Sequence, residues 1–246
     1  MISVCIATYN GEKYIEQQLQ SIISQIGEED EIVISDDGSK DQTIAIVESF
    51  NDKRIKVYYN EGIHGYTPNF ENALKLTKGD YVFLCDQDDV WAPNKIERCM
   101  DELCNNDAVF HDATVINGDG VIINESLKNI RPTFSSLWGN IYKMGHLGCC
   151  TAFRRRIISL ALPFPPNYHY CSHDDWLVEL SCAYGKVSDI DDKLTYYRRH
   201  NYNTSGLKSN QTLFEKIAYR VYELFHLTKR GFRRLFNRQK ITRCRI

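Results

Sequence analysis

The most informative stretch of this chain is YVFLCDQDDVW, residues 81–91. Its apolar first half predicts a buried strand, and the strand is followed at once by Asp86, Asp88 and Asp89. Carboxylates this close raise the free energy of ionising one another, so a bound cation is a simple reason for grouping them. Oxygen ligands suit Mg²⁺ or Mn²⁺, which usually bind one or two carboxylates together with substrate phosphates. The stretch therefore predicts a metal–diphosphate site at the carboxyl edge of an α/β sheet. The simpler alternative is an acidic loop that caps the next helix.

Strand and helix patterns alternate on both sides of this stretch. Continuous apolar runs predict strands over 2–7, 31–35, 55–59, 81–85, 108–111 and 149–153, and residues 196–200 close the globular part. Helical spacing of apolar residues predicts helices over 14–25, 68–77, 93–103, 173–184 and 211–236. Such alternation is typical of an α/β fold with a largely parallel sheet and right-handed crossovers.

Composition narrows the class of protein. The 246 residues are 43% hydrophobic and 25% charged, with a net charge of −2, which gives no general attraction to nucleic acid. No apolar run reaches the length of a membrane span, and the first residues read as a strand rather than a signal peptide. The nine cysteines show no zinc-binding spacing. We therefore expect a cytoplasmic protein in a reducing compartment.

Two further polar motifs follow predicted strands. Asp36-Asp37-Gly38-Ser39 ends the second strand, and a carboxylate there can accept the imide N–H of uracil or thymine. Thr8-Tyr9-Asn10 ends the first strand, and its tyrosine ring offers a surface for stacking a base. Each motif taken alone is equally compatible with an ordinary turn.

The sequence His173-Asp174-Asp175-Trp176 opens a predicted helix. Acidic residues are favoured at a helix N-terminus for electrostatic reasons alone. The functional interpretation is a general base that deprotonates an acceptor hydroxyl. Adjacent residues of a helix point about 100° apart, so only one of the two aspartates can face such a site.

Arg198, Arg199 and His200 follow one another near the end of the globular part. Arginine suits a diphosphate through its paired N–H donors, and a histidine can ligate the metal that the carboxylates predict. Without an acidic metal site, the same residues would be only a solvated strand end.

These constellations, in this order, resemble family 2 glycosyltransferases of the GT-A fold. The matching pieces are Ala7-Thr8-Tyr9-Asn10, Asp36-Asp37-Gly38-Ser39, Gly79-Asp80, Asp86-Gln87-Asp88-Asp89-Val90-Trp91, His173-Asp174 and Arg198-Arg199-His200. Each motif is short, but their order and spacing over residues 1–206 are specific. The resemblance implies a Rossmann-like, mostly parallel central sheet flanked by helices, and an inverting sugar transfer.

The resemblance also implies roles for individual residues. Asp37 would contact the base, and Asp86 and Asp88 would bind the ribose and the metal. The catalytic base would be Asp174, but the residue before it is a histidine where the family normally has glutamate. That departure leaves the base open between Asp174 and the following Asp175.

Three segments look closest to the bacterial rhamnosyltransferase-like branch, which builds surface polysaccharides. They are Asn69-Phe70-Glu71-Asn72-Ala73-Leu74, Asp86-Gln87-Asp88-Asp89-Val90-Trp91 and Tyr197-Arg198-Arg199-His200. It implies a dTDP- or UDP-sugar donor and a glycan or lipid-linked acceptor. Residues 1–91 would form the nucleotide-binding half and residues 92–206 the acceptor half. The loop Gly145-His146-Leu147-Gly148 is a candidate acceptor-side loop, with a plain turn as the alternative.

Residues 207–246 are expected to form a helical basic extension. Its part 229–246 has eight lysines and arginines and no acid, interleaved with apolar residues. Such a segment can lie on an anionic membrane surface at the inner face of the plasma membrane, or it can be a solvated tail. RNA binding is disfavoured, because no aromatic platform accompanies the charge.

Two other functions compete with glycosyl transfer. A sugar-nucleotidyltransferase also uses carboxylates and Mg²⁺, but normally has a glycine-rich basic phosphate loop that Thr8-Tyr9-Asn10-Gly11 lacks. A catalytically inactive nucleotide-sugar-binding partner would be expected to lose Asp88 or the acid that opens the helix at 173, and both are present.

Overall fold

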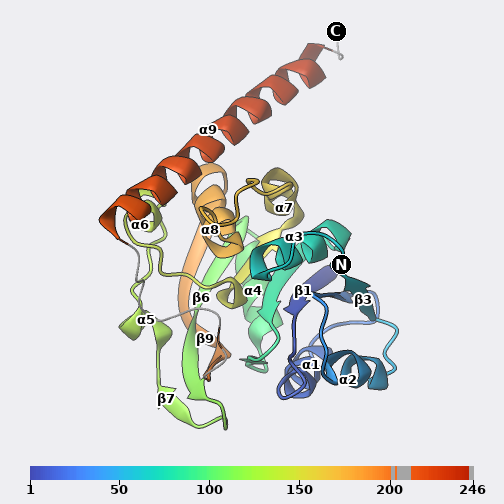
Figure 1. Ribbon diagram of the computed structural model, residues 1–246. Coiled ribbons are helices and arrows are strands. Elements are labelled where there is room, and N and C mark those ends of the chain that lie inside the picture. The colour runs from blue at the N-terminus through green and yellow to red at the C-terminus, as the bar shows by residue number, and fades with distance from the viewer. Residues whose placement is uncertain (201–202, 204–211, 244–246) are drawn as a thin grey trace.

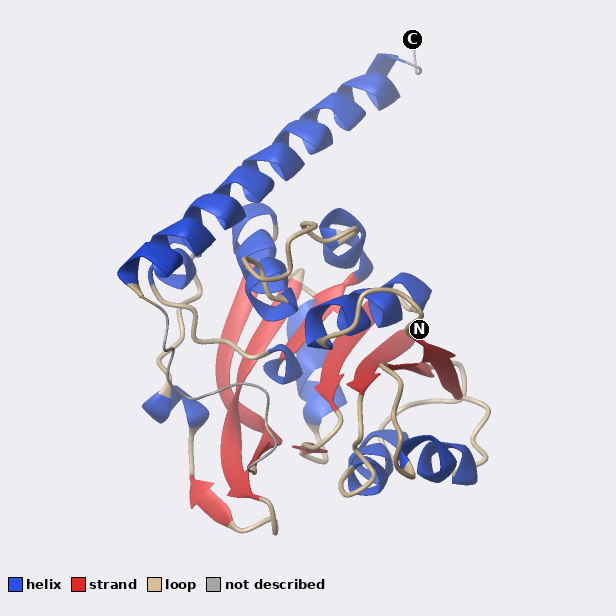
Figure 2. Ribbon diagram, viewed as in Figure 1, coloured by secondary structure: helices blue, strands red, loops and turns tan. Residues whose placement is uncertain are grey.

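The computed structural model describes residues 1–200, 203 and 212–243, and side chains of this part except those of 233–243. The described residues form a curled sheet with helices on both faces, crossed at one end by a long helix (Figures 1 and 2). This is the flanked α/β sheet expected from the sequence.

The first half of the chain supplies four parallel strands in the order β3-β2-β1-β4. Their bounds are Ile2–Thr8 for β1, Glu31–Asp36 for β2, Ile55–Tyr59 for β3 and Tyr81–Asp86 for β4. The connecting helices are α1 (Ile15–Ile23), α2 (Thr43–Ser49) and α3 (Tyr66–Leu76). The predicted alternation of strand and helix is thus confirmed here.

The second half of the sheet is mixed. Strand β8 (Thr151–Arg154) lies antiparallel between β4 and β6 (Ala108–Asn117), and β9 (Val187–Arg199) pairs parallel with β6. The short strands β5 (Val90–Trp91) and β7 (Ile122–Asn124) pair antiparallel with β9 and β6. The remaining helices are α4 (Lys95–Leu103), α5 (Leu127–Ile130), α6 (Leu137–Tyr142), η1 (Gly148–Cys150), α7 (Arg155–Ala161), α8 (His173–Tyr184) and α9 (Leu213–Arg243).

Three details differ from the sequence expectations. The strand expected over 149–153 begins as the single turn η1, because Cys150 N donates to the carbonyl of Leu147. Helix α7 was not expected. Strand β9 is 13 residues long, and eight of these residues are polar or charged. Its sequence therefore lacks the apolar run by which the other strands were predicted.

The two larger of the three apolar clusters in the described residues lie on the two faces of the sheet, as the alternation of side chains along a strand requires. In β4, Val82 and Leu84 pack into the core that includes residues of α3, α7 and α8. Phe83 and Cys85 pack into the other core, with residues of α1, α2 and α4. The two cores fix the sheet, and thereby fix where its strands end.

The carboxyl ends of β1, β2, β4, β6 and β9 point to one edge of the sheet. Strands β1, β2 and β4 are parallel, β6 is parallel to β4 through two antiparallel pairings with β8, and β9 is parallel to β6. All motifs that follow these strands therefore meet at this edge, which is where ligands bind in open α/β sheets.

Helix α9 docks on the body through its first half. The hydroxyl of Tyr184 in α8 donates to the carbonyl of Leu227 at 2.7 Å, and Nη1 of Arg230 donates to the carbonyl of Leu162 at 3.0 Å. The expected boundary between residues 206 and 207 lies outside the described residues and stays a prediction. Among the described residues, no helix is both long enough and apolar enough to cross a bilayer.

Candidate active site

The two aspartates that end β2 have different roles. Oδ1 of Asp36 accepts from the Thr8 hydroxyl at 3.0 Å, and its Oδ2 accepts from the backbone N–H groups of Gly38 and Ser39 at 3.0 and 2.8 Å. Asp36 thus stabilises the turn after β2. Thr8, which was expected to bind the nucleotide, is buried, and its hydroxyl stabilises the same turn through Asp36.

Asp37 instead faces the connection between β3 and α3. Its Oδ1 accepts from Nδ2 of Asn60 at 2.7 Å and lies 3.0 Å from Nδ1 of His64, while Oδ2 accepts from Gly65 N at 2.8 Å. Sequence reasoning missed Asn60 and His64, because nothing in their local pattern points to a carboxylate in another loop.

The loop after β1 is fixed by a side chain from the acidic stretch. Oε1 of Gln87 accepts from Tyr9 N at 2.9 Å, and Nε2 of Gln87 donates to Tyr9 O at 3.0 Å. The backbone N–H of Asn10 donates to Oγ of Ser39 at 2.9 Å. The Tyr9 side chain remains 55% exposed on this fixed backbone, so its ring is available to a ligand.

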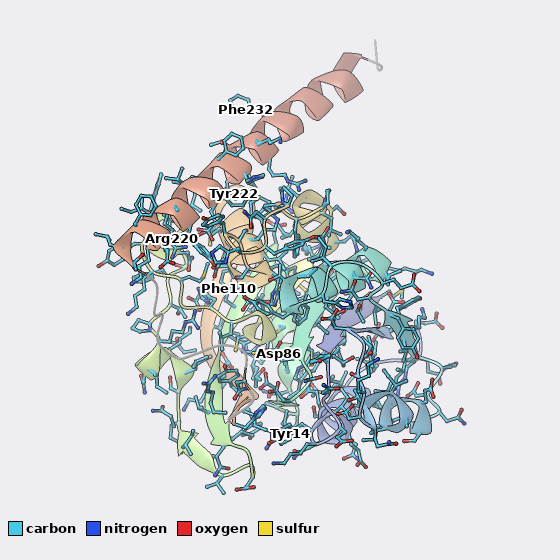
Figure 3. All side chains as sticks on the ribbon, viewed as in Figure 1. Tyr14, Asp86, Phe110, Arg220, Tyr222 and Phe232 are labelled. Carbon is cyan, nitrogen blue, oxygen red and sulfur yellow. The ribbon has the colours of Figure 1, made fainter. Side chains whose placement is uncertain are left out.

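The three carboxylates after β4 do not lie together in one group. Asp86 and Asp89 lie with Cys149, and one ligand atom of each falls within 4.8 Å of the others. Oδ1 of Asp89 accepts from Arg198 N at 2.8 Å, whereas its buried Oδ2 has no hydrogen-bond partner among the described residues. Figure 3 shows Asp86 in the middle of the molecule.

The electrostatics of this cluster favour neutral acids in the absence of a cation. Burial raises the pKa of Asp86 to about 7, with further contributions from Asp88 and Asp174. Burial, Asp88 and Asp86 raise the pKa of Asp89 well above its usual range. Each shift expresses the cost of gathering negative charge away from water.

Asp88 turns away from that cluster and meets the end of β9. Its Oδ2 lies 2.8 Å from Nε2 of His200 and accepts from Nδ2 of Asn203 at 3.1 Å. The imidazole of His200 also stacks on Tyr14, with ring centroids 4.9 Å apart. The structure therefore brings together the two residues that the sequence predicted as metal ligands.

The donor set fits a hard divalent cation. The Asp88 carboxylate, with the His200 imidazole beside it, offers ligands that Mg²⁺ or Mn²⁺ accept, whereas Asp86 and Asp89 form the separate group with Cys149. The unpartnered oxygen of Asp89 and the raised pKa of Asp86 indicate that the negative charge of these carboxylates is not fully compensated by neighbouring groups. The sequence placed Asp89 in the acidic group but gave it no role of its own, and it did not predict Cys149 at this site.

The two arginines at the end of β9 differ sharply. Arg198 is 2% exposed, and its Nε and Nη2 donate to the Asp88 carbonyl and to Oε1 of Gln17, both at 2.7 Å. Nη1 lies 3.3 Å from the carbonyl of Gly118. Through these contacts Arg198 has a structural role and holds the Asp88 backbone next to Gln17. Arg199 is only half-buried, so it is the better placed of the two for a diphosphate.

The start of α8 separates the two candidate bases. Oδ1 of Asp174 lies 2.7 Å from Nε2 of His173, whose ring stacks on Phe70 at 4.1 Å. Burial opposes ionisation of Asp174, but His173 outweighs it and leaves the pKa of this carboxyl below its usual range. Asp174 is also among the groups that raise the pKa of Asp86, so the two carboxyl groups lie within electrostatic reach of each other.

Asp175 has different neighbours. Burial raises its pKa, Asp174 adds to the effect, and Arg220 of α9 and Arg131 oppose it. Its backbone N–H donates to Oγ of Ser172, which caps the helix. Asp175 thus belongs to the junction between α8 and α9.

The loop before β8 packs directly against Asp174. A Cβ added at Gly148 would lie 2.2 Å from Oδ1 of Asp174, so only glycine allows this approach. His146 is buried, and its Nε2 lies 3.0 Å from the carbonyl of Phe134. The candidate acceptor loop is therefore packed rather than a plain open turn, and its contact with an acceptor stays a prediction.

Together, fold and site define an α/β protein with a carboxylate- and imidazole-lined edge suited to a nucleoside diphosphate and a divalent cation. Residues 3–160 match the model of glycosyl transferase family 2, and the chain belongs to that family.

Several curated relatives are similar over most of the chain. The dTDP-rhamnosyl transferase RfbG of Shigella flexneri is 30% identical over 82% of this chain and 73% of its own length. The Escherichia coli UDP-Glc:alpha-D-GlcNAc-diphosphoundecaprenol beta-1,3-glucosyltransferase WfaP is 28% identical over 94% of both chains. Other relatives are longer: the chain spans 66% of an uncharacterized glycosyltransferase of a Nostoc species.

Solved structures share the fold. TarS of S. aureus in complex with UDP-GlcNAc superposes with a TM-score of 0.69 at 23% identity, over 90% of this chain and 66% of that one. A mannosyltransferase of Pyrobaculum calidifontis in complex with GDP-Man and Mn²⁺ gives a TM-score of 0.60 at 18% identity, over 95% of this chain and 64% of that one.

Proposed function

We propose that this protein is a metal-dependent, inverting glycosyltransferase. It moves a sugar from a dTDP- or UDP-sugar to a hydroxyl of a glycan or lipid-linked acceptor in surface polysaccharide synthesis. The observation that carries the proposal is the contact of Asp88 with His200 at 2.8 Å, at the sheet edge where Asp86 lies within electrostatic reach of Asp174.

The nucleoside would bind along the ends of β1, β2 and β4. The exposed ring of Tyr9 can stack on the base, with Asn10 beside it, and the carboxylate of Asp37 can accept the imide N–H. Asp86 can accept from a ribose hydroxyl. Thr8 supports this edge through Asp36.

The diphosphate would lie between Asp88, His200 and Arg199. Asp88 and His200 would hold Mg²⁺ or Mn²⁺, which when bound would neutralise charge that develops on the leaving diphosphate. Arg199 can add a second positive charge, while Arg198 keeps Asp88 and Asp89 in place.

Asp174 is the proposed base, with its carboxylate kept ionised by His173. It would accept the proton of the acceptor hydroxyl as that oxygen bonds to the anomeric carbon. The bond from this carbon to the diphosphate oxygen breaks, and its electron pair leaves with the nucleoside diphosphate. Attack from the face opposite the leaving group inverts the anomeric centre. Asp175 is not used in this step.

The named relatives favour particular partners. The rhamnosyl and glucosyl transferases above suggest a dTDP- or UDP-sugar, and the diphosphoundecaprenol in one name suggests a lipid-linked acceptor. With such an acceptor, the protein would work in the cytoplasm, at the inner face of the plasma membrane.

The first experiment measures thermal stabilisation by UDP, dTDP and GDP, each with and without Mn²⁺. We expect one nucleotide to raise the melting temperature in a metal-dependent way, and Asp88→Asn to abolish the effect. Asp101→Asn, an exposed acid on α4, is the matched control. No stabilisation by any nucleotide would contradict the proposal.

An activity assay with the selected nucleotide sugar then separates an enzyme from an inactive binding partner. Asp174→Asn should retain nucleotide stabilisation but lose transfer. Release of pyrophosphate from a sugar phosphate and a nucleoside triphosphate would instead indicate a nucleotidyltransferase.

A further inference from the structure

Helix α9 presents a row of large apolar side chains on one face. Five residues are between 53% and 81% exposed, and their spacing of three, four, four and seven places them on one side of the helix: Phe214, Ile217, Val221, Phe225 and Phe232. We name these five residues the outer row. Monomeric proteins rarely expose so continuous an apolar surface without a partner for it.

The opposite face of α9 holds the helix on the body. Glu223 and Leu227 are buried there, and Leu227 accepts the Tyr184 hydroxyl through its carbonyl. The outer row therefore points away from the body, and Figure 3 shows Phe232 on that outer side, with Tyr222 nearer the body. Within the described part of the chain, no segment covers this row.

Charge favours one occupant over the others. Residues 229–246 carry eight lysines and arginines and no acid, so parallel pairing of this helix with a second copy would bring like charges together. An anionic lipid surface has the complementary charge, and aromatic and aliphatic side chains can enter its headgroup region beside it.

We infer that α9 lies in the plane of an anionic lipid bilayer and inserts its outer row into the headgroup region. This surface extends beyond the basic segment 229–246, because most of the outer row precedes that segment. The inference rests on the proposed function in one respect, because the proposed lipid-linked acceptor would bring the protein to a bilayer. The binding itself needs neither donor, acceptor nor turnover.

The test is flotation of the full chain with vesicles of phosphatidylcholine, alone or mixed with phosphatidylglycerol. Wild-type protein should float with the anionic vesicles and not with the neutral ones. The triple variant Phe214→Ser/Val221→Ser/Phe225→Ser should lower the partition coefficient at least about tenfold, since three apolar side chains no longer enter the headgroup region.

The matched control is Val121→Ser/Ile123→Ser on the β6–β7 hairpin, which is similarly exposed and lies at the opposite end of the molecule in Figure 1. It should bind vesicles like the wild type. Nucleotide-dependent thermal stabilisation, retained in both variants, shows that they are folded and that the donor site is intact.

Two results would overturn the inference. Wild-type protein that stays with neither vesicle type, while nucleotide stabilisation persists, rejects the membrane surface and leaves the proposed function standing. A wild-type dimer in light scattering that the triple variant converts to a monomer, without vesicle binding, shows that the outer row contacts a second copy.

Discussion

Nε2 of His200 lies 2.8 Å from Oδ2 of Asp88, although 112 positions separate the two residues in sequence. One follows β9 and the other follows β4, so the contact joins the second half of the sheet to the half proposed to bind the nucleotide. As the proposed ligands of one cation, the two residues can hold it together only when both halves are correctly folded.

His200→Ala should therefore weaken Mn²⁺ binding at least about tenfold, since even the loss of a residue that only supports a ligand costs 10- to 100-fold. Titration calorimetry with Mn²⁺ measures the change. The exposed His169→Ala is the control. An unchanged affinity in His200→Ala would remove this histidine from the metal site.

Metal binding should depend on pH through the charge of Asp86, which lies near the proposed ligand Asp88. Burial, with Asp88 and Asp174, raises the pKa of the Asp86 carboxyl to about 7, so below that pH a neutral Asp86 leaves less negative charge near the cation. The Mn²⁺ affinity should rise with pH up to about pH 7 and then level off. Asp86→Asn should flatten this dependence. An equally steep profile in the variant would exclude Asp86 as the cause.

His173 should set the acidic limb of the reaction. Burial disfavours its charge, but Asp174 outweighs burial and raises the pKa of the imidazole, while the pKa of Asp174 falls. In His173→Gln the base loses its charged neighbour, so the acidic limb of kcat/KM should move to higher pH by about one unit. His169→Gln should leave it in place. A uniform loss of kcat without movement of the limb would mean that His173 acts only through packing.

Gly148→Ala should displace the proposed base. The new Cβ would lie 2.2 Å from Oδ1 of Asp174, and a misplacement of about 1 Å can cost on the order of a hundredfold in rate. Steady-state kinetics should show a lower kcat, with nucleotide stabilisation retained. Gly27→Ala, whose Cβ would meet only the side chain of Asp30 at 3.5 Å, is the matched control. Normal turnover in Gly148→Ala would separate this contact from catalysis.

The junction of α8 and α9 should make stability pH-dependent. Burial, with mutual repulsion, raises the pKa of Glu179 to about 9, and burial with Asp175 raises that of Glu223 to about 8. The unfolded chain ionises glutamate near about 4.3, so above that pH the folded state binds more protons and stability falls as pH rises toward about 8 to 9.

Glu223→Gln removes one of these titrations. Between about pH 6 and pH 8 we expect it to lose at least about 1 kcal/mol less stability than the wild type, measured by urea unfolding. Glu97→Gln, exposed on α4, should follow the wild-type profile. Parallel profiles for Glu223→Gln and wild type would contradict the assignment.

The sequence was sufficient to predict which residues meet at the sheet edge, because that depends only on where the strands end. The apolar run of β4 stops at Asp86, and parallel strands place their carboxyl ends on one edge, so the neighbourhood of Asp86, Asp37 and Tyr9 could be predicted before their contacts were known. His200 was assigned to this edge for a different reason, namely that an imidazole can ligate the metal that the carboxylates predict.

Contacts between loops could not be predicted in this way. Asn60 reaches Asp37, and Gln87 binds both backbone groups of Tyr9, through packing of segments that share no local pattern. Strand β9 was mostly missed because Asp189, Asp191 and Asp192 resemble a loop, yet pairing with β6 holds this segment extended. Helix α7 was missed because seven residues are too few to show a clear helical period.

Strand β9 pairs with β6 from one end of the strand to the other. Its Val187 pairs with Ala108 at one end, and its Arg199 pairs with Asn117 at the other. A ladder can slip only by whole residues, each about 3.3 Å, and every single step turns all side chains to the opposite face. The pairing shifts register on either side of Asp112, so the regular ladder next to His200 runs from Ala113 to Asn117. A one-residue slip of that ladder would turn the His200 side chain away from Asp88.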